Sequence, residues 1–255
     1  EDVLLTGREP LTDYSKVELN RIIDTGANFT VATIRTPASV MESLSDIHLK
    51  LPIIAMDGAV LYDLKENSYL KTFSMSYNQA QKIIEILREE DVNFFINVVV
   101  EDVLIIYYHH LENEAETQIY KQMRRSPHRN YVRRNLPKGE DVVYFMMVDQ
   151  TKKIQKIYER LKVKIHSQEY KMLCYASKDY PGYSYIKIYD KDATRERMTK
   201  YLAEDMGIHK ITTFGSISGK SDVLVEDSNK NTMVKELKKL FEPVRLPWKK
   251  EDTKG

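Results

Sequence analysis

The sequence predicts a mixed α/β protein with a three-layer core, in which helices flank a mainly parallel sheet. Near the amino end, short apolar strands alternate with helical segments, an order typical of parallel sheets with crossover helices. The same alternation returns toward the carboxyl end. Between these regions neighbouring strands follow one another directly, which predicts antiparallel pairing in an α+β module. We therefore expect a core of residues 1–78 and 183–255, with residues 79–182 inserted as a second domain.

The first elements follow from apolar spacing and from residues that break helices. A helix is expected from about Thr12 to Gly26, because apolar residues recur at helical spacing and glycine ends the pattern. Strands are predicted at residues 29–33 and 51–55, where β-branched and apolar residues cluster. A helix at residues 37–44 connects them. Asp57 and Gly58 then indicate a turn.

The remaining elements are assigned in the same way. Helices are predicted at residues 78–89, 114–123, 152–161, 194–204 and 231–241. Strands are predicted at residues 93–99, 103–108, 142–148, 171–176, 183–189, 210–214 and 222–225. The basic stretch that follows the helix at residues 114–123 is expected to be irregular.

The composition is typical of a globular protein and selects no partner by charge alone. Hydrophobic residues make up 42%, charged residues 30%, and the net charge is +1. The single cysteine, Cys174, cannot form an internal disulfide, which fits a reducing compartment. No apolar run approaches the ~18 residues of a membrane span. We expect a cytoplasmic protein with no membrane partner and no signal peptide.

Two motifs look like known sites without meeting their requirements. The segment from Gly215 to Lys220 looks like a phosphate-binding loop, which has four residues between its glycines and a helix after its lysine. Here only three residues separate Gly215 from Gly219, and a predicted strand follows. His109 and His110 are adjacent, so on a strand their rings point to opposite faces. Neither motif predicts a binding site.

A third pattern is more specific. The segment VATIR at residues 31–35 ends a predicted strand, and LPIIAMDGA follows at residues 51–59. This pair resembles the ATGR turn and the PIIxxNGA segment of the Cof-type sugar phosphatases in the haloacid dehalogenase (HAD) superfamily. The inserted module also matches that family's large cap domain in size and position. The resemblance covers nearly the whole chain and implies a Rossmann-like core with a cap.

The resemblance implies a phosphate site. In that family an aspartate attacks phosphorus, a second aspartate moves the proton, and Mg²⁺ neutralises the charge between them. Carried over by position, Thr33 binds the phosphoryl group, Arg35 is retained from the turn, and Arg195 replaces a lysine with its charge kept. Asp57 and Gly58 fall in the substrate pocket, where Asp57 replaces an asparagine and adds a negative charge.

Other positions depart from the family. Glu1 falls on the second aspartate, which moves protons, and the nucleophile would precede Glu1 by two positions. Ser216 replaces a metal-binding aspartate, and Lys220 falls on the next metal position with the wrong charge. Asp222 reaches that position only through a shift in register. The expected Mg²⁺ set is therefore degenerate.

Two functions stay open, and with them the question of whether the chain is an enzyme. One is a phosphatase-like protein that is catalytically impaired, needs no cofactor and keeps a phospho-ligand pocket. The other is an active Mg²⁺-dependent phosphohydrolase of small phosphorylated metabolites, whose nucleophile lies upstream of residue 1. The basic stretch from Lys121 to Lys138 is expected to be either a solvated loop or a site for an anionic ligand or nucleic acid.

Overall fold

The computed structural model describes residues 3–5, 11–226 and 231–241. The chain divides into two compact units. Unit 1 comprises Glu1–Val31, Val40–Leu51 and His209–Gly255, and unit 2 comprises Ala32–Ser39 and Pro52–Ile208. Among the described helices, none is both long enough and apolar enough to cross a membrane.

Unit 1 contains a helix pair and a short parallel strand pair. Helix α1 (Asp13–Asp24) is capped by Thr12, whose side chain accepts a hydrogen bond from the Ser15 amide. It packs against α7 (Thr232–Phe241) through buried apolar residues of both helices. Strands β10 (Phe214–Gly215) and β11 (Val223–Leu224) pair in parallel.

Unit 2 begins with a small sheet that positions the predicted site. Strands β1 (Ile53–Ala55), β2 (Val60–Asp63) and β3 (Ser68–Thr72) are antiparallel, and a tight turn, η1 (Met56–Gly58), separates the first two. Ala32 bridges to Ile54 in the parallel sense. Helix α6 (Arg195–Asp205) buries Met198 and Leu202 against this sheet. Helix α2 (Pro37–Leu44) follows the bridged segment.

A six-stranded sheet forms the larger part of unit 2, in the order β6-β5-β4-β7-β9-β8. Its strands are β4 (Phe95–Val100), β5 (Val103–Tyr108), β6 (Arg129–Arg133), β7 (Tyr144–Gln150), β8 (Tyr170–Ala176) and β9 (Tyr183–Asp190). All neighbours are antiparallel except β5 and β6. Side chains therefore alternate between two faces along every strand.

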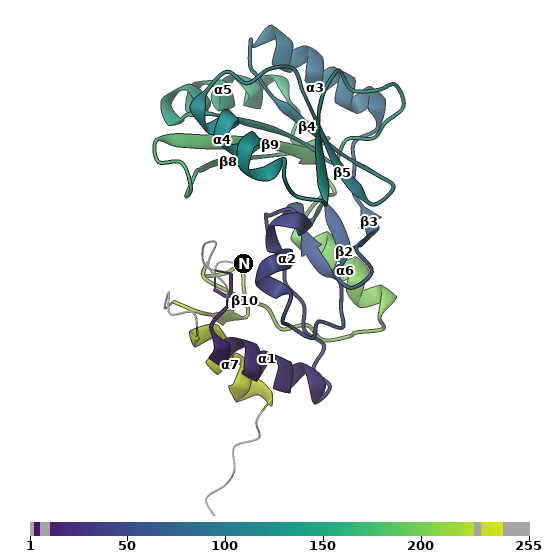
Figure 1. Cartoon of the computed structure of the whole chain (residues 1–255), viewed down its shortest axis with the longest axis vertical. Coiled ribbons are helices and arrows are strands. Elements are labelled where there is room, and N and C mark those ends of the chain that lie inside the picture. The colour runs from purple at the N-terminus through teal and green to yellow at the C-terminus, as the bar shows by residue number, and fades with distance from the viewer. Residues whose placement is uncertain (1–2, 6–10, 227–230, 242–255) are drawn as a thin grey trace, which may run out of the picture. The chain divides into compact units, whose positions relative to one another are not determined.

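Helices cover the two faces of this sheet unequally. Figure 1 shows α3 (Tyr77–Glu89) and α5 (Thr151–Lys164) on the same side. Their apolar stripes bury a large core with the strand residues that point toward them, among them Phe145, Ile186 and Ile188. On the opposite face, α4 (Glu114–Met123) makes a smaller cluster around Val148. That face also carries buried aliphatic residues such as Leu104 and Ile106, together with tyrosines and the cations Arg129 and Lys187.

The structure has the mixed α/β fold that the sequence predicts, and most long elements lie where they are expected. The sequence misses β2 and β3, which are short, and β6, because its basic composition conceals a strand. Of the strand expected at residues 29–33, only the Ala32 bridge forms. The division at residues 79 and 183 stays a prediction; β9 pairs in register with β7 and β8 in the six-stranded sheet.

Candidate functional site

The turn between β1 and β2 has an unusual backbone. Met56, Asp57 and Gly58 all have positive φ, at 51°, 57° and 92°. Aspartate tolerates this left-handed region better than most residues. At Gly58 a Cβ atom would lie only 2.1 Å from the carbonyl carbon of Thr194. Only glycine therefore lets the turn approach the start of α6, and this approach brings Asp57 close to Arg195.

Thr33 is fully buried beside this turn. Its amide donates to the Ile54 carbonyl at 2.8 Å, and its carbonyl accepts from the Asp57 amide at 2.9 Å. Its hydroxyl oxygen accepts from the Arg35 amide at 3.1 Å, while the Arg35 carbonyl accepts from the Met56 amide. Thr33 is not the cap of α2, which begins at Pro37. These bonds hold the segment from Thr33 to Arg35 against the turn.

Asp57 joins two cations. Its Oδ1 accepts from Arg195 Nε at 2.8 Å, and its Oδ2 lies 3.0 Å from Lys171 Nζ. Lys171 also donates to the Asp57 and Ala193 carbonyls. The Asp57 and Lys171 side chains are only 15% and 18% exposed, whereas that of Arg195 is 38% exposed. One carboxylate thus faces two cations, so the cluster has an excess of positive charge.

Burial acts on the Lys171 ammonium. Desolvation lowers the pKa of Lys171, the Asp57 carboxylate opposes this, and the Arg195 guanidinium adds to the lowering. The carboxylates of Asp57 and Glu196 therefore compensate the charged ammonium only in part. A further anion at this point would be attracted by both cations.

A layer of tyrosines and lysines continues from Lys171 across the face that α4 covers only in part. Lys171 Nζ lies 4.7 Å from the Tyr189 ring centre, and that ring stacks on Tyr144 at 5.1 Å. Lys187 Nζ lies 5.2 Å from the Tyr144 ring and 5.8 Å from the Tyr175 ring. Lys187 also donates to the carbonyl of Ile34, next to Thr33, at 3.4 Å.

Arg129 occupies β6, in the basic stretch that the sequence analysis expects to be irregular; that expectation is wrong. Arg129 is only 5% exposed. One terminal nitrogen donates to the Thr36 hydroxyl at 3.1 Å and the Ser39 hydroxyl at 3.0 Å. Its Nε is buried and forms no hydrogen bond with any residue that the structure describes. Burial raises the pKa of Tyr131 to about 12, with the Arg129 charge acting against it.

Ser216, Lys220 and Asp222 lie in unit 1, around β10 and β11. Ser216 and Lys220 are exposed. Asp222 Oδ2 accepts from the amide and the hydroxyl of Thr213, at 2.8 and 2.7 Å. These bonds lower the pKa of Asp222 and use its carboxylate to hold β10 to β11.

The residues of this loop do not fit the Mg²⁺ that the resemblance implies. Mg²⁺ requires oxygen ligands, usually with carboxylates. Here Ser216 is neutral, Lys220 is cationic, and the Asp222 carboxylate is already bonded to Thr213. No group of three His, Cys, Asp or Glu side chains converges within the described parts of the chain. Glu1, the expected acid and base, lies outside the described residues.

The structure brings together the residues that the sequence predicts in unit 2. These are Thr33, Arg35, Asp57, Gly58 and Arg195. Their roles in binding stay predictions. Three further cations face the same region. Lys171 and Lys187 are not predicted from the sequence, and Arg129 is included there only as part of the basic stretch that was offered as a possible anion site. Lys187 does leave a signal in the sequence, because it interrupts the apolar and aromatic run from Tyr185 to Tyr189.

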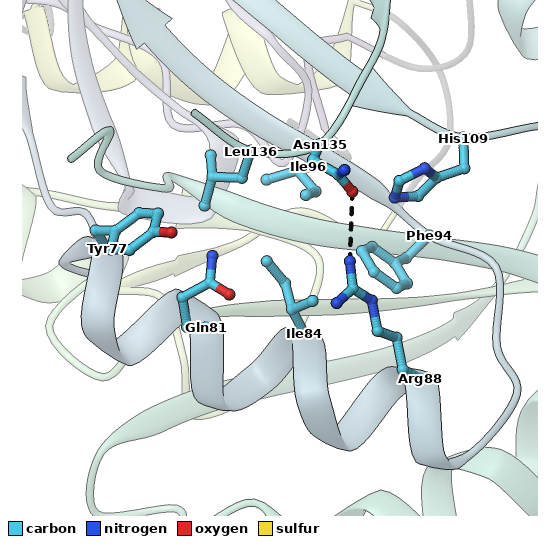
Figure 2. A pocket seen from close by; sticks show the side chains of 9 residues that line it. All are labelled: Tyr77, Gln81, Ile84, Arg88, Phe94, Ile96, His109, Asn135 and Leu136. Carbon is cyan, nitrogen blue, oxygen red and sulfur yellow. Dashed lines mark hydrogen bonds between the residues drawn. The ribbon is translucent and has the colours of Figure 1, made fainter. Parts of the chain in front are cut away.

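A pocket of about 230 Å³ opens elsewhere in unit 2, on the side of the six-stranded sheet that α3 covers. Figure 2 shows Arg88 donating to Asn135 Oδ1, at 3.4 Å, above an apolar floor that includes Ile84 and Phe94. Burial and the Arg88 charge lower the pKa of His109 at its edge. The pocket contains none of the predicted site residues.

The family comparison covers almost the whole chain. The model of the haloacid dehalogenase-like hydrolases matches residues 2–241. A protein of Mycoplasma pneumoniae, named "Putative phosphatase", is 38% identical over 71 residues. That match spans 27% of this chain and 23% of the relative's length.

Solved structures share the fold at low sequence identity. A haloacid dehalogenase-like hydrolase from Bacillus subtilis has a TM-score of 0.69 at 13% identity, covering 94% of this chain and 97% of its own. One from Bacteroides thetaiotaomicron has a TM-score of 0.68 at 12% identity, covering 94% and 96%. A HAD subclass IIB sugar phosphatase has a TM-score of 0.64 at 13% identity, covering 93% and 95%.

Proposed function

The chain belongs to the haloacid dehalogenase-like hydrolase family, and we propose that it is a phosphatase-like protein that binds a small phosphorylated ligand but hydrolyses it poorly or not at all. The observation that carries this proposal is an asymmetry between two sets of residues. The expected phosphate-binding residues cluster around Asp57 with excess positive charge. The expected metal-binding loop contains one carboxylate, that of Asp222, which already accepts two hydrogen bonds from Thr213.

The binding half of the proposal rests on three groups. Arg195 and Lys171 supply a guanidinium and an ammonium, the donors that bind phosphate most strongly. Thr33 supplies a hydroxyl whose oxygen already accepts from Arg35, and no described residue accepts from its O–H. All three belong to unit 2. A phosphoryl group here would meet two charges and a hydroxyl donor.

Asp57 limits that affinity, because it already neutralises part of the charge. Its carboxylate oxygens take one bond from each cation. A phosphoryl group must therefore compete with Asp57 for Arg195 and Lys171. We expect phosphate esters to bind weakly in the native chain, with Asp57 as the residue that sets the affinity.

The catalytic half rests on the loop of unit 1. Without a carboxylate at Ser216, and with a cation at Lys220, the loop lacks the charge that attracts Mg²⁺. Loss of one member of a catalytic unit commonly lowers turnover by orders of magnitude, and further losses then change little. This chain is accordingly proposed to be a pseudoenzyme.

The test combines an activity assay with calorimetry. The chain is assayed on a panel of sugar phosphates and p-nitrophenyl phosphate, while Mg²⁺ and ligand binding are titrated separately. We expect negligible turnover, no heat from Mg²⁺, and measurable binding of phosphate esters. Robust turnover that a chelator abolishes would contradict the pseudoenzyme and favour the Mg²⁺-dependent phosphohydrolase.

A matched pair of variants locates the defect. The double change Ser216→Asp with Lys220→Asp restores the family's charge in the loop, and we expect it to produce Mg²⁺ heat that the native chain lacks. The control, Ser218→Asp with Lys210→Asp, makes the same change in charge at other positions of unit 1. Equal Mg²⁺ heats from both doubles would show that the two positions have no special role.

Location and macromolecular partners are also proposals. A single cysteine without an internal partner supports a reducing compartment such as the cytoplasm, which fractionation of cells would test. In the basic stretch, Arg129 is buried against hydroxyls. We therefore propose that this part of the stretch serves the small-ligand site and not nucleic acid.

A further inference from the structure

Two buried cations in unit 2 have no counter-ion among the residues that the structure describes. Arg129 is 5% exposed and Lys187 is 8% exposed. Within the described residues, no carboxylate lies within ion-pair distance of either side chain. Lys171, by contrast, has Asp57 at 3.0 Å. Arg129 and Lys187 are therefore buried cations that no described carboxylate compensates.

Such charges are expensive to bury. A charged group that leaves water loses several kcal/mol of solvation, which proteins normally recover with an ion pair and hydrogen bonds. Lys187 is held instead by two tyrosine rings and a long bond to the Ile34 carbonyl. Arg129 is held by the hydroxyls of Thr36 and Ser39 and also interacts with the Tyr131 hydroxyl, while its buried Nε has no partner in the described structure. All of these partners are neutral.

Arg129 also lies beside the beginning of helix α2, where a positive charge is unfavourable. Thr36 immediately precedes α2, and Ser39 lies in its first turn. The beginning of a helix has a positive partial charge, which favours an anion and disfavours a guanidinium. A cation and a helix N-terminus that face each other through two hydroxyls provide the donors of an anion site. The unpaired Nε is a second, independent sign of a missing acceptor.

The two cations connect to the proposed phosphate site. Lys187 donates to Ile34, which lies between Thr33 and Arg35. The stacked rings of Tyr144 and Tyr189 join Lys187 to Lys171, which bonds to Asp57. The hydroxyl of Tyr189 is also buried without a hydrogen-bond partner among the described residues. A layer of cations and tyrosines thus extends from the proposed phosphate site to Arg129.

We infer that Arg129 and Lys187 form a second anion subsite, and that the ligand is a small phosphorylated molecule with a second anionic group, a phosphate or a carboxylate. This inference rests on the proposed function, since the first phosphate occupies the site of Thr33, Lys171 and Arg195. The second group takes the Arg129 Nε–H and the Lys187 ammonium. The Thr36 and Ser39 hydroxyls and the Ile34 carbonyl hold these cations until it binds.

The experiment compares ligands that differ only in the second group. Glucose 6-phosphate, glucose 1,6-bisphosphate and 6-phosphogluconate are titrated into the full chain by calorimetry. We expect at least one of the two doubly anionic ligands to bind at least about tenfold more tightly than glucose 6-phosphate. One additional charge-assisted hydrogen bond contributes enough free energy for a gain of this size. The ligand with the larger gain identifies the second group as phosphate or carboxylate.

A variant and its matched control assign that gain to the subsite. Arg129→Gln should remove the tenfold gain, so that the doubly anionic ligands bind no more tightly than glucose 6-phosphate. Arg134→Gln removes the same charge from an exposed neighbour in the basic stretch and should retain the gain. If Arg129→Gln does not fold, Lys187→Gln carries the same expectation.

The outcomes separate this inference from the proposed function. Equal binding of all three ligands, or equal weakening of all three by Arg129→Gln, would overturn the second subsite while the phosphate site stands. No binding of any of the three ligands would overturn both. A gain that Arg134→Gln abolishes equally would reduce the effect to overall charge, and would also overturn the subsite.

Discussion

The two faces of the six-stranded sheet are equally buried at several positions but differ in their chemistry. On β9, Ile186 and Ile188 are fully buried in the core beneath α3 and α5. Lys187, between them, points to the opposite face and is 8% exposed. One face buries apolar surface and so stabilises the fold. The other buries charge, which opposes stability unless a ligand compensates it.

The difference teaches that burial by itself does not identify a structural residue. The first face packs its aromatic rings among other apolar side chains, and Phe94 meets Phe145 there edge to face at 6.0 Å. The second face holds tyrosines against cations. Proteins that retain a destabilising group usually do so for function. Mutations on the two faces should therefore have opposite effects on stability and on binding.

The largest expected effect is on the apolar face. Ile186→Ala should lower the free energy of unfolding by about 2–5 kcal/mol, because it leaves a cavity in the core. Urea denaturation measures this loss, and affinity for phosphate esters in the folded fraction should be unchanged. A loss below about 1 kcal/mol would mean that this face does not dominate stability.

The next effect is on affinity at the charged face. Asp57→Asn removes the carboxylate that competes for Lys171 and Arg195, and asparagine also tolerates the left-handed backbone at this position. We expect phosphate esters to bind about tenfold more tightly, or about 1.4 kcal/mol. Calorimetry with glucose 6-phosphate measures the change. The control is Asp63→Asn, which makes the same change from carboxylate to amide at another turn of unit 2.

Weaker binding by Asp57→Asn would show instead that Asp57 orients the two cations for the ligand. In that case the cluster would still be the phosphate site, but its carboxylate would support binding and not compete with it.

A smaller effect of opposite sign is expected at Lys187. Lys187→Met removes a buried charge without an ion pair and keeps the length of the side chain. The free energy of unfolding should stay equal or rise by about 0–1 kcal/mol, since the lost solvation cost offsets the lost contact with the tyrosine rings. Thermal unfolding without ligand measures it. A loss comparable to that of Ile186→Ala would mean that the two faces do not differ in kind.

The smallest effect concerns Glu116 of α4, on the same face as Lys187. Glu116 is 1% exposed, and burial raises its pKa, although Asn93 and the amides of Glu112 and Asn113 act against this. A raised pKa in the folded state means that ionisation opposes folding. This cost is fully present above the folded pKa and is relieved as the pH falls toward the ordinary value near 4.5.

The stability of the native chain should therefore rise relative to that of Glu116→Gln when the pH falls from 7 to 4.5. Urea denaturation across this interval measures the difference. Parallel stability profiles of the two proteins would show that the hydrogen bonds compensate the buried carboxylate completely.

The sequence by itself determined the elements whose signals are local. Helix α4 lies at the predicted residues because Asn113 caps it and apolar residues follow at helical spacing. The turn at Asp57 and Gly58 and the β8–β9 pair also follow from neighbouring residues. The ordered motifs predicted the family, which the match over residues 2–241 confirms.

Only the tertiary structure decided which charges meet. Asp57 is more than a hundred residues from both Lys171 and Arg195 in sequence, so no local pattern relates it to them. Arg129 resembles its exposed neighbours in the basic stretch until the pairing of β6 with β5 buries it. Strand alternation makes Lys187 face away from Ile186. Which face holds the uncompensated charge depends on the packing of α3 and α5, because distant residues compete for the same apolar surface.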